Sequence, residues 1–165
     1  MNDIKVVLQS LNDRYDEEQD LQYLQLYSKM SVIEFCGWIE VSFDEIWKQY
    51  VNRVISNDKI KEYLIKTIDD NYGFEYTRNI QKTFCTIIGG KNWQTLLTQL
   101  ENNRLGSSSD LKSILNDFSK RRNSFAHTTI GLPITCTYDS PSIAINNYNK
   151  LRPILMQINT IMSNL

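Results

Sequence analysis

The residues best suited to chemistry lie in one stretch, residues 117–128, which contains the only histidine of the chain, His127. Arg122 stands five positions before this histidine, and Asn123 follows the arginine. An imidazole with a pKa of about 6.5 can both accept and donate a proton near neutral pH. A guanidinium donates two parallel hydrogen bonds to paired oxygens, and an amide can donate to an anion or orient a neighbour. The stretch therefore predicts proton transfer at a phosphate-like group.

Three other charged residues are candidates for a supporting role. Lys120 and Arg121 precede Arg122 and are most simply a solvated helix end that complements the helix dipole, with phosphate contacts as the alternative. Glu40 lies within an otherwise apolar segment, where an uncovered carboxylate would be costly. It is either part of the site or the partner of Arg121 or Arg122 in a salt bridge.

Helical spacing limits how Arg122 and His127 can cooperate. Arg122 falls within an apolar stripe of the expected helix, which consists of Leu111, Ile114, Leu115, Phe118 and Phe125. At about 100° per residue, positions five apart lie roughly 140° apart around the axis. Either the helix frays before His127, or two copies of the chain pair so that both motifs line one cleft. With no other information, a lone histidine near a helix end is more simply a dipole partner or a packed side chain than a catalyst.

The spacing Arg122-Asn123-x-x-x-His127, at the end of an amphipathic helix, resembles the Arg-polar-x-x-x-His motif of HEPN domains, many of which are metal-independent ribonucleases. The resemblance implies a homodimer that cleaves RNA, with no cofactor and no metal. It implies His127 as general acid or base, Arg122 as a clamp for the transition state and Asn123 as a positioning residue. On this resemblance, Glu40 would be the additional polar or acidic residue that HEPN domains often carry on an earlier helix near the cleft.

The same resemblance suggests a toxin or an abortive-infection effector in antiviral defence. It implies as partner a nucleotidyltransferase-type antitoxin or a larger defence protein. Two hypotheses of other classes stay open: a non-catalytic helical dimerisation module that binds a nucleotide, RNA or a partner protein, and a purely structural subunit. Growth arrest on overexpression, relieved by changing Arg122 or His127, would distinguish the nuclease from both.

The elements that must position these residues are predicted to be helices throughout. We expect one all-α domain over residues 1–165, a bundle of about five or six helices with a short irregular or strand-like segment at residues 128–137. Ser31 is expected to cap the second helix, Asn57-Asp58 to open the third, and Gly89-Gly90 to end the fourth. The bundle is expected to be built from segments of helical pattern over residues 8–27, 31–55, 59–67, 76–88, 93–100, 111–127 and 142–162.

Composition excludes several classes of protein. Eighteen basic and nineteen acidic residues give a net charge of −1, so a nucleic acid would need a local basic patch. The three cysteines, Cys36, Cys85 and Cys136, lack metal-ligand spacing and are expected to be reduced thiols. No signal peptide and no membrane-spanning segment are evident, which predicts a cytoplasmic protein without a membrane partner. Neither a serine-hydrolase elbow nor a phosphate loop is present.

Overall fold

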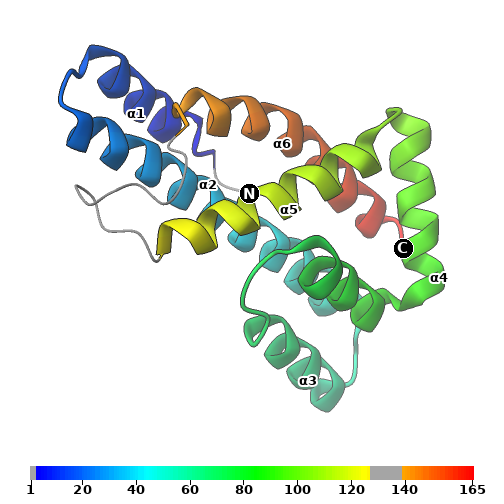
Figure 1. The fold of residues 1–165 in the computed structure, drawn as a ribbon. Coiled ribbons are helices and arrows are strands. Elements are labelled where there is room, and N and C mark those ends of the chain that lie inside the picture. The colour runs from blue at the N-terminus through cyan, green and yellow to red at the C-terminus, as the bar shows by residue number, and fades with distance from the viewer. Residues whose placement is uncertain (1–2, 127–138) are drawn as a thin grey trace.

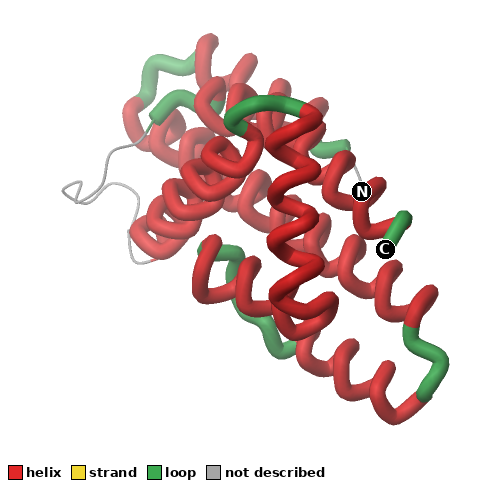
Figure 2. The backbone as a smooth tube through the Cα atoms, turned by 90° about the vertical axis from the view of Figure 1, so that its right-hand side faces the viewer, coloured by secondary structure: helices red, strands yellow, loops and turns green. Residues whose placement is uncertain are grey.

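The computed structural model describes residues 3–126 and 139–165, and within them the only secondary-structure elements are helices, which are joined by loops (Figures 1 and 2). This confirms the all-α prediction of about six packed helices; the strand-like segment expected at residues 128–137 lies outside the described residues. No helix in the described part combines the length and apolarity that crossing a membrane requires. The elements are α1 (Lys5–Glu17), α2 (Leu21–Val54), α3 (Asp58–Asp69), the π-helical turn η1 (Tyr76–Gln81), α4 (Lys82–Asn103), α5 (Ser107–Ala126) and α6 (Ser142–Ser163).

The longest helix, α2, begins earlier than its sequence predicts. The expected first helix over residues 8–27 is wrong, because the chain leaves the helix at Glu18 and the Asp20 carboxylate caps a new one by accepting a hydrogen bond from the backbone N–H of Gln22. Ser31 is not a cap either. It lies inside α2, where its hydroxyl donates to the carbonyl of Ser28. The result is one helix of 34 residues against which most other helices pack.

Other helix boundaries follow their local chemistry. The Asn57 side chain caps α3 by accepting from the N–H of Ile60, as turn chemistry at this position predicts. Gly89 interrupts α4 as expected, with φ at +81°, although the helix resumes at once and continues to Asn103. Glu101 accepts from the N–H groups of Gly106 and Ser108 and so fixes the start of α5. The helix expected to begin at Tyr76 does so, but its first turn is π-helical.

Buried aromatic rings attach α2 to three neighbouring helices. Each pair meets edge to face, a geometry worth about 0.5–1.5 kcal/mol beyond the burial of area. Trp38, Trp47 and Trp93 are all buried. The pairs are Phe35 with Phe118 of α5 at 4.6 Å, Trp38 with Tyr148 of α6 at 4.8 Å, and Trp47 with Phe84 of α4 at 5.4 Å between ring centroids.

Candidate functional site

Arg122 lies on the inner side of α5 and pairs with Glu40 of α2. The buried rings of Phe118 and Phe125, one on either side along the helix, hold this face of α5 against the core. Arg122 Nη1 lies 3.0 Å from Glu40 Oε1, and its guanidinium carbon is 6.0 Å from the centroid of the Phe74 ring. The two side chains keep 38% and 29% of their surface exposed, so the pair lies at the edge of the core. Of the two partners considered for Glu40, the structure selects Arg122.

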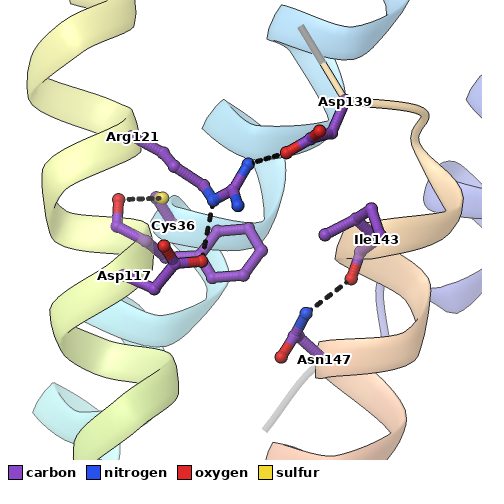
Figure 3. A network of polar contacts seen from close by, with 7 residues as sticks. Cys36, Asp117, Arg121, Asp139, Ile143 and Asn147 are labelled. Atoms are coloured by element: carbon purple, nitrogen blue, oxygen red, sulfur yellow. Dashed lines mark hydrogen bonds and ion pairs between the residues drawn. The ribbon is translucent and has the colours of Figure 1, made fainter. Parts of the chain in front are cut away.

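Cys36 lies one helical turn before Glu40 and serves the packing. Its side chain is buried, and the thiol donates a weak hydrogen bond to the carbonyl of Phe118, with 3.7 Å between sulfur and oxygen (Figure 3). Burial raises the pKa of Cys36 to about 12, an effect that the positive charge of Arg122 only partly opposes. A thiol held in this protonated form is a poor nucleophile.

Arg121 and Lys120 point in different directions. Arg121 donates from Nε to Asp117 Oδ2 at 2.7 Å and from Nη1 to Asp139, which precedes α6 (Figure 3). This contact between α5 and the entry to α6 gives Arg121 a structural role, and Arg121 does not line the pocket in which Lys120 and Arg122 lie. The neighbouring positions face apart because each residue turns the helix by about 100°.

An open pocket of about 500 Å³ brings together three of the residues predicted from the sequence, Lys120, Arg122 and Asn123. One wall is α5, where Asn116 and Ser119 complete the surface. The opposite wall is the segment from Tyr72 to Asn79, which contributes Gly73, Glu75 and Arg78. Sequence reasoning missed Arg78 and Asn116, because no spacing connects either of them with the motif.

The second wall is held in place by a small set of hydrogen bonds. The N–H of Tyr76 donates to Asn116 Oδ1 at 3.1 Å, which fastens η1 to α5. The Glu75 carboxylate accepts from the N–H groups of Thr77 and Arg78 and so caps the π-helical turn. The Asn79 amide donates to Tyr72 O and accepts from the N–H of Glu75, which closes the preceding loop.

The electrostatics of the pocket favour an anion. Arg78, Lys120 and Arg122 line it, and the one carboxylate among the lining residues, Glu75, is already engaged by two backbone N–H groups. Among residues 3–126 and 139–165, no group of His, Cys, Asp and Glu is arranged to hold a metal ion. His127 lies outside the described residues and follows Ala126, the last residue of α5, directly. The arrangement is suited to binding a phosphate-like group beside the position where the imidazole enters the chain.

Comparison with known proteins gives one result for nearly the whole chain. The model of the family described as RiboL-PSP-HEPN matches residues 1–162. The comparisons with curated proteins and with solved structures found no match. The family match confirms the resemblance that the Arg-Asn-x-x-x-His spacing indicated.

Proposed function

Because this chain belongs to the RiboL-PSP-HEPN family, a family of predicted ribonucleases, we propose that it is a metal-independent endoribonuclease. One observation carries the proposal furthest. Arg122, fixed by Glu40, shares a cationic pocket with Lys120 and Asn123 at the end of the helix that leads into His127. A phosphodiester bound there would meet both a guanidinium and a titratable ring.

The proposed reaction uses only protein side chains and the ribose itself. The 2′-oxygen attacks the adjacent phosphorus while the bond to the 5′-oxygen breaks, which leaves a 2′,3′-cyclic phosphate and a 5′-hydroxyl. His127 takes the proton of the 2′-hydroxyl or supplies the one that the leaving 5′-oxygen needs. Arg122 stabilises the pentavalent phosphate, and Asn123 donates to a phosphate oxygen or orients a neighbour. Glu40 positions Arg122, whose other N–H groups would bind the substrate.

We further propose that the active unit is a homodimer with a composite site. If α5 continued regularly through residue 127, positions 122 and 127 would lie roughly 140° apart, and the two side chains of one copy would not converge. A two-fold axis beside the end of α5 would place Arg122 of one copy opposite His127 of the other. We also propose that the protein acts in the cytoplasm as a toxin or defence effector. Its partner would be an antitoxin or a larger defence protein. This part of the proposal comes from the family resemblance alone.

Cleavage of a labelled single-stranded RNA by the purified protein tests the activity. We expect wild type to yield cyclic phosphate ends, and the variants His127→Ala and Arg122→Gln to lose at least about a hundredfold in rate. Lys150→Gln, which changes an exposed cation of α6 outside the pocket, is the control and should cut normally. A His127→Ala protein that cuts as fast as wild type would end the proposal.

Mixing the two inactive variants tests the composite site. If each site takes Arg122 from one copy and His127 from the other, a mixed dimer contains one intact site and one doubly defective site. Since half of the dimers are mixed after random exchange of subunits, about a quarter of the wild-type activity should return. No recovery in a mixture shown to exchange subunits would mean that both residues act within one copy.

A further inference from the structure

The pocket has a cationic wall that the catalytic proposal leaves unused. Arg78 lies in η1 and Lys120 on α5, so the two cations approach the pocket from different elements. Both side chains are exposed, and neither forms an ion pair within residues 3–126 and 139–165. The other cations near the site are engaged, Arg121 by Asp117 and Asp139, and Arg122 by Glu40. Arg78 and Lys120 are therefore positive charges available to a ligand.

Two hydrogen bonds to backbone N–H groups hold the segment that carries Arg78 beside α5. The Glu75 carboxylate binds the backbone N–H of Arg78 at 2.8 Å, and Asn116 of α5 binds the N–H of Tyr76. These contacts fix the backbone of η1 against α5 while the Arg78 side chain remains exposed. A preorganised backbone that carries an exposed guanidinium is suited to a flexible polyanion, because the long side chain can reach the phosphate without rearrangement of the fold.

On the basis of the proposed ribonuclease function, we propose that Arg78 and Lys120 bind a backbone phosphate of single-stranded RNA next to the one that is cleaved. The pocket, at about 500 Å³, lies within the range of about 300–1,000 Å³ that is usual for ligand sites and is large enough for a nucleotide unit. In this proposal the scissile phosphate binds to Arg122, on the α5 wall of the pocket. Arg78 marks the opposite wall, so the strand runs across α5 towards η1. Both residues hold substrate and take no part in proton transfer.

Binding to a protein that does not cut RNA tests this directly. The probe is a short fluorescent oligouridylate, and the parent protein carries His127→Ala, so that Kd is measured by anisotropy without cleavage. Arg78→Gln and Lys120→Gln should each raise Kd roughly fivefold. Each should also reduce the slope of log Kd against log salt by about 0.7 between about 50 and 200 mM, as expected for one lost phosphate contact on a single strand.

Two matched controls remove the same charges elsewhere. Arg14→Gln changes an exposed arginine in the last turn of α1, and Lys150→Gln changes an exposed lysine of α6. Both should leave Kd and slope at the parent values. Equal losses in the control and pocket variants would show that only the overall charge matters and would overturn the inference. So would a parent protein that does not bind the oligonucleotide, or pocket variants that bind as tightly as the parent.

Kinetics with an intact His127 separates this inference from the proposed function. In that background, Arg78→Gln should raise KM roughly fivefold and leave kcat within about twofold, the pattern of lost substrate binding. RNA binding that depends on Arg78 and Lys120, in a protein that never cuts, would uphold the phosphate contact of these two residues and refute the nuclease. Cleavage with a KM that neither substitution changes would refute the inference and uphold the proposed nuclease.

Discussion

Neutralising Glu40 is the perturbation that most directly tests how the site is held together. The change Glu40→Gln keeps the shape of the side chain and removes the charge that faces Arg122. At the observed separation of 3.0 Å, the attraction between unit charges is about 1.4 kcal/mol in water and about 5.5 kcal/mol at an effective dielectric constant of 20. Since both side chains are about one-third exposed, solvent screening and the cost of ordering them reduce the net coupling to about 1 kcal/mol.

A double-mutant cycle on the free energy of unfolding measures this coupling. Urea denaturation of wild type, Glu40→Gln, Arg122→Gln and the double variant should give an interaction energy of about 1 kcal/mol. Glu34→Gln, at an exposed position of the same helix, is the control and should show no coupling with Arg122→Gln. If Glu40 also orients the guanidinium for catalysis, Glu40→Gln should lower the RNA cleavage rate about tenfold at a nearly unchanged KM. A coupling energy near zero would refute the role assigned to the ion pair.

Three further predictions concern groups packed around α2. Burial raises the pKa of Asp44 to about 6, against an ordinary value of about 4, so its ionised form destabilises the fold and the free energy of unfolding falls as the pH rises from about 4 to about 6. Asp44→Asn should therefore be more stable than wild type by about 1–2 kcal/mol in urea denaturation at neutral pH and should lose this advantage near pH 4; an equal gain at both pH values would contradict the assignment. Cys36, buried and with a pKa of about 12, should resist alkylation by iodoacetamide in the native protein while the half-buried Cys85 reacts, as peptide mass spectrometry would show; rapid labelling of Cys36 under native conditions would refute its burial. Phe118→Ala should cost about 3–5 kcal/mol of unfolding free energy, because it leaves a cavity beside Phe35, and a cost below about 1 kcal/mol would show that this ring does not anchor α5.

Helix content could be predicted from the sequence wherever the local signals were strong. Asn57 acts through its side-chain cap and Gly89 through its positive φ, and both effects are local, so they appear at the predicted positions. The break between α1 and α2 was missed because it contains neither glycine nor proline. There the Glu18 and Asp20 carboxylates accept hydrogen bonds from backbone N–H groups. Acidic residues also occur on the exposed faces of helices, so the sequence alone does not show that these two end one helix and begin the next.

The candidate site was predictable in part, for a related reason. Helical spacing places Arg122 on the apolar face of its helix, and that face meets α2, so a carboxylate partner for it follows once the packing is known. Spacing alone could not decide whether Lys120 or Arg121 accompanies Arg122, because the answer depends on Asp139, which approaches from another part of the chain. The place of Arg78 in the pocket could not be predicted from the sequence for the same reason. Its place opposite α5 depends on the contact between Tyr76 and Asn116, which are 40 positions apart.

The π-helical turn η1 gives the far wall of the pocket an unusual sensitivity to chain length. A π-helical turn fits one more residue into its turn than an α-helix does, and it runs without interruption into α4. Loss of one residue from this turn would let the segment relax into ordinary α geometry, which would change the direction of the side chains within the turn while α4 kept its place. Arg78 lies within this turn, so its side chain would then no longer line the pocket, even though α4 itself had not moved. In related chains with a shorter turn at this position, we therefore expect other residues to bind the RNA strand.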